Sequence, residues 1–196
     1  MKKDIVLGGV GGQGILTIAT VIGMAALSEG LQLKQSEVHG MSQRGGDVQS
    51  NLRLSSDPIA SDLIPEGKAD MILAVEPLES LRYVNMLNRQ TGWLITSINP
   101  FRNIPDYPSL EEVLAEITKL PRYITIDAEK MALAQGSVKA ANIVVLGAAA
   151  PFLGLSYASL ENAIRRLFGK KGEDIVEMNL KALKAGRDFA EENRME

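Results

Sequence analysis

A glycine-rich segment near the N-terminus constrains the fold more than any other feature of the chain. Gly9-Val-Gly-Gly-Gln-Gly14 follows a short apolar run at residues 4–8 and precedes an apolar stretch, residues 13–29, typical of a helix ended by Gly30. The segment matches G-x-G-x-x-G, in which glycines let the backbone turn tightly and let a phosphate approach the first amides of the helix. A strand that leads through such a loop into a helix predicts an α/β fold.

The rest of the chain continues this alternation of strands and helices. Apolar or alternating runs predict further strands at residues 31–38, 48–54, 71–75, 93–98 and 123–126. Helices are expected at residues 77–87, 110–120, 128–135, 140–150, 159–168 and 174–192. We therefore expect one domain, residues 1–196, with a doubly wound, mostly parallel, Rossmann-like three-layer sheet, helices on both faces and a helical C-terminal part. The helix at residues 13–29 is apolar nearly all round, so either a partner subunit or its own domain must cover its outer face.

The composition excludes several classes of protein. The 196 residues include no cysteine and one histidine, which excludes disulfides, thiolate-bound iron–sulfur clusters, zinc–thiolate sites and multi-histidine metal sites. The net charge of −3 argues against nonspecific binding of nucleic acid. The apolar run at residues 143–155 contains Pro151 and is too short to span a bilayer, and the N-terminus lacks the apolar core of a signal peptide. We expect a cytoplasmic protein with no membrane segment and no metal site.

A second unusual segment gathers polar side chains in the loop after the second predicted strand. It brings together an acid, the only histidine, a hydroxyl, an amide, an arginine and two glycines: Glu37, His39, Ser42, Gln43, Arg44, Gly45 and Gly46. Loops at the carboxyl ends of parallel strands meet at one edge of a sheet, so this loop is expected beside the first glycine loop. There Arg44 can hold a phosphate or carboxylate with two hydrogen bonds, and His39 can donate a hydrogen bond or relay a proton. The alternative is a tight connection between strands in which Arg44 pairs with an acid.

From the residues alone, three interpretations of the first loop remain open: a phosphate-bearing ligand, a nicotinamide or flavin dinucleotide, and tight packing without a ligand. The dinucleotide interpretation needs an acid at the end of the second strand, for which Glu37 is the candidate. Glu76 either begins a helix or contacts a ligand, Asn99 is expected in a turn, and Lys170-Lys-Gly172 is expected to be a solvated turn.

The two glycine motifs together carry a family resemblance. Gly9-Val-Gly-Gly-Gln-Gly14 and Ser36-Glu-Val-His-Gly-Met-Ser-Gln-Arg-Gly-Gly46 resemble the gamma-type domain of the 2-oxoacid:ferredoxin oxidoreductases. The second motif resembles the indolepyruvate branch, since the pyruvate and 2-oxoglutarate branches usually carry Pro-Glu-Met-Arg-Gly-Gly. Leu63-Ile-Pro-Glu-Gly67, Ala69-Asp70 and Glu76-Pro-Leu-Glu79 extend the agreement to essentially the whole chain.

The resemblance implies a small subunit without catalytic residues of its own. The family decarboxylates a 2-oxo acid on thiamine diphosphate, passes electrons through [4Fe-4S] clusters to ferredoxin and forms an acyl-CoA. Thiamine diphosphate and the clusters are then expected on a large partner subunit, in a hetero-oligomer such as a dimer of heterodimers, with the isolated chain inactive. CoA is the candidate ligand of this chain. The implied cofactor-binding residues are Gly9, Gly11, Gly12, Gln13, Gly14, Arg44, Gly45 and Gly46. The implied substrate or interface residues are Glu37, His39, Ser42 and Gln43.

Three alternative functions remain open at this point. One is the gamma subunit of a pyruvate, 2-oxoisovalerate or 2-oxoglutarate oxidoreductase. Another is an oxidoreductase that works alone with NAD or a flavin. The last is a regulatory module that binds CoA or a nucleotide outside any enzyme complex.

Overall fold

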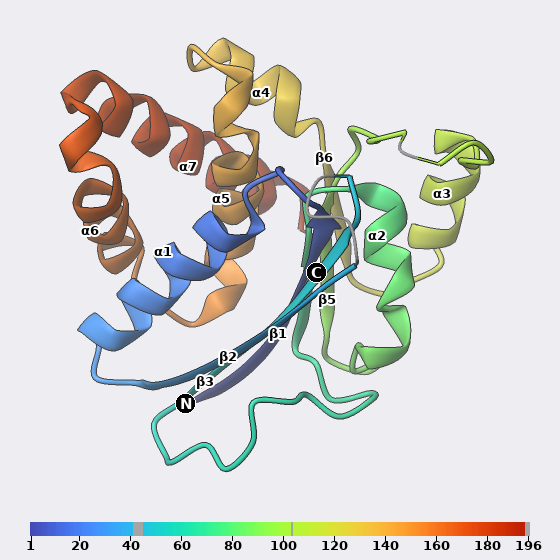
Figure 1. Cartoon of the computed structure of the whole chain (residues 1–196), viewed down its shortest axis with the longest axis horizontal. Coiled ribbons are helices and arrows are strands. Elements are labelled where there is room, and N and C mark those ends of the chain that lie inside the picture. Colours follow the sequence, from blue (N-terminus) through green and yellow to red (C-terminus); the bar gives the residue numbers. More distant parts are fainter. Residues whose placement is uncertain (41–44, 103, 195–196) are drawn as a thin grey trace.

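The computed structural model describes residues 1–40, 45–102 and 104–194, and in this part of the chain a six-stranded sheet separates two layers of helices (Figure 1). The strand order is β2-β3-β1-β4-β5-β6. The strands are β1 (Lys2–Val10), β2 (Gln32–His39), β3 (Asp47–Ser55), β4 (Met71–Ala74), β5 (Trp93–Ser97) and β6 (Tyr123–Ile126). Because β1, β4, β5 and β6 are parallel, the expected mostly parallel α/β fold is confirmed.

Strand β3 departs from a doubly wound sheet because it runs antiparallel to both of its neighbours, β1 and β2. The connection between His39 and Asp47 is too short for a crossover helix, so β2 and β3 form a hairpin. The hairpin places β3 between β2 and β1, which a dinucleotide-binding fold would pair directly. The alternation at residues 48–54 predicts the strand itself but neither its direction nor its position.

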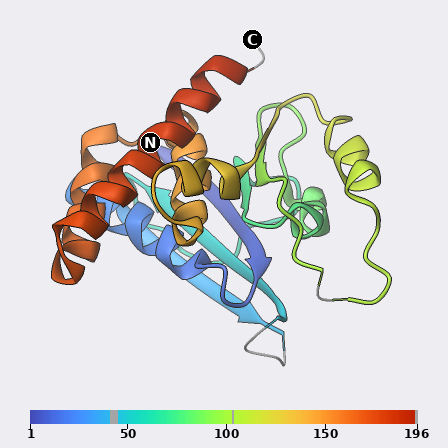
Figure 2. The same cartoon turned by 90° about the horizontal axis from the view of Figure 1, so that it is seen from above.

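The helices cover both faces of the sheet, as expected. They are α1 (Ile15–Ser28), α2 (Pro77–Arg82), α3 (Leu110–Ile117), α4 (Ala128–Ala134), α5 (Ala141–Leu153), α6 (Tyr157–Phe168) and α7 (Glu173–Asn193), with 3-10 turns η1 (Val84–Met86), η2 (Val138–Ala140) and η3 (Gly169–Lys171). Ile5 and Leu7 of β1 point into the core shared with α1 and α5, whereas Val6 points into the core formed with α2 and α3. Figure 2 shows α2 and α3 on one side of the strands and α1 and α7 on the other.

Helix α7 crosses α5 at a pair of glycines that face each other's backbone. A Cβ atom built on Gly147 would lie 2.1 Å from the carbonyl oxygen of Leu183, and one on Gly186 would lie 1.9 Å from the carbonyl oxygen of Val144. Only glycine permits such an approach, because real Cβ atoms essentially never come within 3.0 Å of another atom. This close approach of the two backbones fixes where α5 and α7 meet.

Helix α1 obtains most of its cover from its own chain. Its inward residues, among them Ile18 and Ile22, are buried in the core that also contains residues of α5 and α6. Leu16 and Leu27 point outward and are 53% and 58% exposed. Although α1 and α5 are strongly apolar, no helix within the described ranges has the length and apolarity required to cross a bilayer.

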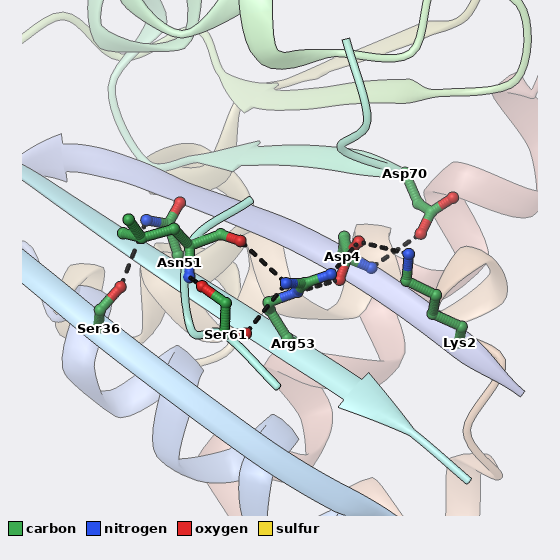
Figure 3. Close-up of polar contacts among 8 residues, drawn as sticks. Lys2, Asp4, Ser36, Asn51, Arg53, Ser61 and Asp70 are labelled. Carbon is green, nitrogen blue, oxygen red and sulfur yellow. Dashed lines mark hydrogen bonds and ion pairs between the residues drawn. The ribbon is translucent and has the colours of Figure 1, made fainter. Parts of the chain in front are cut away.

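A buried ion pair fastens β1 to β3 on the face away from α1 (Figure 3). Arg53 donates from Nε and Nη2 to the two carboxylate oxygens of Asp4, at 2.8 and 3.1 Å. Its Nη1 donates to the carbonyl oxygens of Ser61 and Leu63, at 3.0 and 2.9 Å, so Arg53 also anchors the loop that follows β3. Asp4 is 1% exposed, so the ion pair is shielded from solvent, and it joins the two inner strands β1 and β3.

Candidate functional site

The site forms at the edge of the sheet where the parallel strands end. The first glycine loop follows β1, residues 75–76 follow β4, and residues 98–99 follow β5 at this edge (Figure 1). The hairpin loop after β2 reaches the same edge, since β2 points in the same direction as β1. In open α/β sheets, ligands bind outside the carboxyl ends of the strands, so this edge is the expected position of a site.

The glycines of the first loop serve different purposes. A Cβ on Gly9 would lie 2.5 Å from the side chain of Val75, so this glycine is required for packing. Gly14 has φ +83° and would place a Cβ 2.4 Å from Nδ2 of Asn142. Gly12 has φ +103° but faces open space, with no atom within 4 Å of its Cβ position. The loop therefore combines tight packing at its two ends with an accessible backbone at its centre.

The side chain of Gln13 closes this loop. Its Oε1 accepts a hydrogen bond of 2.8 Å from the N–H of Val10, and the N–H of Gln13 donates to the carbonyl oxygen of Val10 at 3.1 Å. Gln13 is thus primarily a structural residue of the turn, although it also lines two cavities. The sequence places it in the motif but does not reveal this internal hydrogen bond.

The structure brings the two glycine motifs together. The N–H of Gly11 donates to the carbonyl oxygen of Gly46 at 2.8 Å, and the N–H of Gly45 donates to the carbonyl oxygen of Gly11 at 3.5 Å. Gly45 adopts φ +77°, which favours glycine at this turn. The expectation that the second loop lies beside the first is therefore met for the described part of that loop.

Several predicted site residues of the second motif lie outside the described residues. These are Ser42, Gln43 and Arg44, together with the side chain of His39. The proposed clamp by an arginine at this loop therefore stays a prediction.

Glu37 is not placed where a dinucleotide would require an acid. It pairs with Ser50 of β3, and Ser50 in turn pairs with Leu7 of β1. Two strand spacings, about 10 Å, therefore separate Glu37 from the strand that carries the glycine loop. In the dinucleotide-binding arrangement the acid ends the strand directly beside that loop. The inserted β3 removes the geometric basis of the NAD or flavin alternative.

A groove that the sequence does not reveal lies beside the glycine loop. It measures about 800 Å³ and opens between the glycine loop, η2 and the start of α7. A smaller cavity of about 100 Å³ at the ends of β4 and β5 shares three of its residues, Gln13, Lys139 and Asn142. The groove is lined by Gly12, Gln13, Gly14, Thr17, Gly136, Ser137, Lys139, Asn142, Phe168, Lys171, Ile175, Met178 and Asn179.

Asn142 connects the groove to the glycine loop. Its Nδ2 donates to the carbonyl oxygen of Gly14 at 3.2 Å, so the start of α5 holds the start of α1. The residues of the groove's far wall, Lys139, Lys171 and Asn179, come from three separate elements. Sequence spacing carries no signal for such a grouping. Lys171, which the sequence suggests is only part of a solvated turn, lines the groove.

Two polar residues at this edge have structural partners. Glu76 is 1% exposed and accepts hydrogen bonds from the N–H of Glu79 at 2.8 Å, the N–H of Phe101 at 3.2 Å and the hydroxyl of Tyr107. Burial, followed by the hydrogen bond to Glu76, raises the pKa of Tyr107. Glu76 therefore begins α2 and anchors the following loop, which agrees with its interpretation as a helix-start acid.

Asn99 also has a structural position, in the turn after β5. Its amide donates to the carboxylate of Asp127 at 2.9 Å and its Oδ1 accepts from Ser97 Oγ at 2.7 Å. The predicted turn role of Asn99 is thus confirmed. In the described residues no group of three or more acidic, histidine or cysteine side chains is arranged to hold a metal ion.

The comparisons with known proteins agree with the motifs. Residues 4–189 match the family model described as pyruvate ferredoxin/flavodoxin oxidoreductase. The indolepyruvate oxidoreductase subunit IorB of Archaeoglobus fulgidus is 40% identical over 97% of this chain and 96% of its own length. IorB of Pyrococcus horikoshii is also 40% identical, over 98% of each chain. The ketoisovalerate oxidoreductase subunit VorA of Methanothermobacter marburgensis is 28% identical over 95% of this chain but only 36% of its own length.

Solved structures share the fold. A keto/oxoacid ferredoxin oxidoreductase gamma subunit from Geobacter sulfurreducens superposes with a TM-score of 0.71 at 25% identity, covering 97% of this chain and 99% of its own. The 2-oxoglutarate:ferredoxin oxidoreductase of Magnetococcus marinus, solved with 2-oxoglutarate, coenzyme A and succinyl-CoA bound, gives a TM-score of 0.77 at 22% identity. The superposed region covers 97% of this chain and 31% of the chain of the Magnetococcus protein.

Proposed function

The chain belongs to the pyruvate ferredoxin/flavodoxin oxidoreductase family, and on that premise we propose that it serves a complex that oxidises indolepyruvate or a related aryl pyruvate. It is a small, gamma-type subunit of a 2-oxoacid:ferredoxin oxidoreductase. The observation that carries the substrate assignment is the 40% identity to two IorB subunits over nearly the full length of both partners. The Gly-Met-Ser-Gln-Arg-Gly-Gly form of the second motif agrees with that assignment.

In the proposed reaction the aryl pyruvate loses CO2, aryl-acetyl-CoA forms and ferredoxin is reduced. The chain contains no cysteine, the residue that ligates [4Fe-4S] clusters, so the clusters must be supplied by another polypeptide. Thiamine diphosphate, which supplies the decarboxylation chemistry when bound, is likewise assigned to the large partner subunit. This chain then contributes binding surface and shape to a cytoplasmic hetero-oligomer, for which we propose a dimer of heterodimers.

The relation to longer relatives supports a permanent partner. In VorA of M. marburgensis the matching region makes up 36% of the chain, so the equivalent domain is covalently attached to the rest of its subunit. The two IorB relatives match over 96% and 98% of their own length, so in those proteins the domain is a separate subunit, which noncovalent contacts must hold in a complex. Val38 near the carboxyl end of β2, Phe101 in the segment after β5 and Val138 of η2 are 60%, 44% and 43% exposed. We assign the contact with the large subunit to the edge of the sheet near these side chains.

Two of the open alternatives lose support. The ketoisovalerate and common gamma subunits are 28–31% identical to this chain, below the IorB subunits. An independent NAD or flavin enzyme would need an acid beside the glycine loop, a position from which β3 separates Glu37.

The proposal is tested by a substrate panel on the complex reconstituted from this chain and its large subunit. Ferredoxin reduction is measured with indolepyruvate, phenylpyruvate, pyruvate and 2-oxoglutarate, each with and without CoA, and each subunit alone serves as a control. We expect CoA-dependent activity with the aryl pyruvates from the complex and none from this chain alone. A complex that prefers pyruvate or 2-oxoglutarate would refute the aryl assignment, and turnover by the isolated chain would refute its role as a subunit without chemistry of its own.

A further inference from the structure

We propose that the outer edge of β2 pairs with the same strand of a second copy of this chain, so that two sheets join across a twofold axis. This pairing goes beyond the proposed function, because it does not depend on the 2-oxo acid that the complex oxidises. Three features of the described residues support it: an unprotected edge strand, backbone groups that point outward, and a self-complementary helix face above the edge.

Strand β2 forms one edge of the sheet and lacks the usual protections of an edge strand. It is eight residues long, contains no proline and pairs residue for residue with β3, without a bulge. Figure 3 shows β2, which carries Ser36, outside β3 and β1. Its only lysine, Lys34, lies over the face of the sheet, where Nζ donates to the carbonyl oxygen of Ala60 at 3.1 Å. Because natural proteins shorten, bend, charge or cover their edge strands, such an edge is expected to have a partner strand.

The opposite edge of the sheet is protected in two ways. Strand β6 has only four residues, and helix α7 packs beside it. Phe189 and Asn193 of α7 line a cavity of about 260 Å³ together with Tyr123, Ile124 and Thr125 of β6. Within the described residues, the chain thus protects one edge of its sheet but not the other.

The backbone of β2 presents hydrogen-bonding groups on its outer side. The N–H of Gly40 donates to the carbonyl oxygen of Asp47, directly opposite, at 3.0 Å. Since hydrogen-bonded pairs alternate along an antiparallel ladder, the even-numbered residues of β2 bond to β3 and the odd-numbered residues direct their backbone groups outward. The backbone N–H and C=O groups of Leu33 and Gln35 have no partner among the described residues. A strand added at this edge would supply one.

The sequence of β2 limits how two copies can pair. A twofold axis normal to the joined sheet sets one residue of the strand opposite itself in the second copy. An axis at Lys34 or Glu37 would oppose two like charges, which destabilises a pair of strands. An axis at Gln35 or Ser36 sets no like charges directly opposite each other, and axes nearer the ends of β2 would pair fewer residues. The two central residues of β2 are therefore the favoured centres.

A face of α1 lies above this edge and suits a second copy of itself. Gly23 points to β2, since a Cβ built on it would lie 3.0 Å from the side chain of Leu33. Leu16, Thr20 and Leu27 share this face of α1, because they lie three, four or seven residues from that glycine. The two leucines are 53% and 58% exposed.

The order of side chains along this face is the same in both directions. A leucine stands at each end, and the small side chains of Thr20 and Gly23 lie between them. A twofold axis reverses the second helix, so the Leu16 of each copy would lie towards the Leu27 of the other. Both copies would then place leucine near leucine and remove exposed apolar surface from water. This self-complementary order favours a second copy of the chain over an unrelated partner.

Disulfide trapping tests the pairing directly, because the chain contains no cysteine of its own. Directly opposite Cα atoms of antiparallel strands lie about 4.5–5.5 Å apart, a separation that a disulfide spans. We expect Gln35→Cys or Ser36→Cys, whichever lies at the axis, to form a covalent dimer of twofold mass under mild oxidation. The control is Thr118→Cys, exposed at the end of α3 in the other helix layer, which should stay a monomer. Failure of both β2 variants to cross-link, with and without the large subunit, would overturn the proposal.

A matched pair of variants at Gln35 separates backbone pairing from side-chain contacts. Gln35→Pro removes an N–H that points outward and takes no part in the β2–β3 ladder, so circular dichroism should show the fold retained. Gln35→Ala removes the same side chain but keeps the N–H. In light scattering we expect the native chain and Gln35→Ala to have twice the mass of Gln35→Pro. Equal masses for all three folded proteins would contradict the pairing.

Cross-linking within the reconstituted complex distinguishes this inference from the proposed function. Mass spectrometry should find the small subunits of the complex joined to each other through the introduced cysteine. If the large subunit instead protects β2 from cross-linking, the edge belongs to that subunit and the proposal is wrong. Joined small subunits in a complex that oxidises no 2-oxo acid would leave the pairing standing and refute the function. An active complex whose small subunits never cross-link would do the reverse.

Discussion

The crossing of α5 and α7 offers the most demanding test of the packing that shapes the groove. In Gly186→Ala the new methyl group would lie 1.9 Å from the carbonyl oxygen of Val144, against the 3.4 Å at which ordinary contacts begin. The clashing oxygen belongs to the helix backbone and cannot move aside by a change of rotamer, so the two helices must separate. Overpacking of this kind costs about 3 kcal/mol. We therefore expect the free energy of unfolding to fall by about that amount.

Urea denaturation, followed by circular dichroism, measures the change. With a denaturant slope of about 3 kcal/mol per M, the midpoint should fall by about 1 M. The control is Gly169→Ala, whose Cβ position has no atom within 4 Å and whose φ is −54°. That change should leave stability unchanged or raise it by about 0.4–1 kcal/mol. A midpoint for Gly186→Ala equal to that of the native sequence would refute the glycine crossing as the determinant of helix separation.

Three further changes probe separate parts of the structure. Asn142→Ala removes the hydrogen bond to Gly14 and should lower the free energy of unfolding by about 1 kcal/mol in urea titrations; an unchanged midpoint would exclude a role in holding the loop. Arg53→Met leaves the buried carboxylate of Asp4 without its main partner and should cost about 3–5 kcal/mol by the same measurement, whereas a cost below about 1 kcal/mol would mean that solvent reaches the pair. Burial, and next the charge of Glu79, raises the pKa of the Tyr83 hydroxyl from 10.0 to about 12. Because the unfolded chain then loses the hydroxyl proton at a lower pH than the folded chain, the free energy of unfolding should fall as the pH rises from 10 to 12. In Tyr83→Phe that alkaline loss should be smaller, which urea titrations at about pH 9 and about pH 11 will show; equal losses in both proteins would contradict the assignment.

Much of the fold is predictable because its signals are local. The strand, loop and helix around residues 4–29 follow from an apolar run, closely spaced glycines and a terminating Gly30, all within one segment. The capping of α3 is equally local, since Ser109 and Glu112 form the reciprocal hydrogen bonds that their spacing predicts. Such patterns depend only on neighbours in sequence.

The topology of the hairpin depends on information of a different kind. The alternation at residues 48–54 shows that one face of a strand is buried but not which strands flank it. Only the pairing of β3 with both β1 and β2 reveals that Glu37 lies away from the glycine loop. The short connection before Asp47 does indicate the direction of β3, because its length allows a hairpin and excludes a crossover between parallel strands.

The candidate groove is beyond the reach of sequence patterns for the same reason. Lys139, Lys171 and Asn179 have no spacing that relates them to the glycine loop, and a pair of lysines before a glycine is usually a solvated turn. They meet the loop because Gly147 and Gly186 let two helices cross closely, a contact between distant parts of the chain. The motif therefore predicts the position of the site but only one of its walls.

Native purification from the source cells, with this chain as bait, tests the central claim most directly. The eluate is examined by mass spectrometry, by iron and thiamine diphosphate analysis, and by CoA-dependent reduction of ferredoxin with indolepyruvate. The account predicts a large, cysteine-rich partner that carries iron and thiamine diphosphate, together with activity on the aryl pyruvate. A chain that elutes without such a partner and without activity on any 2-oxo acid would contradict it.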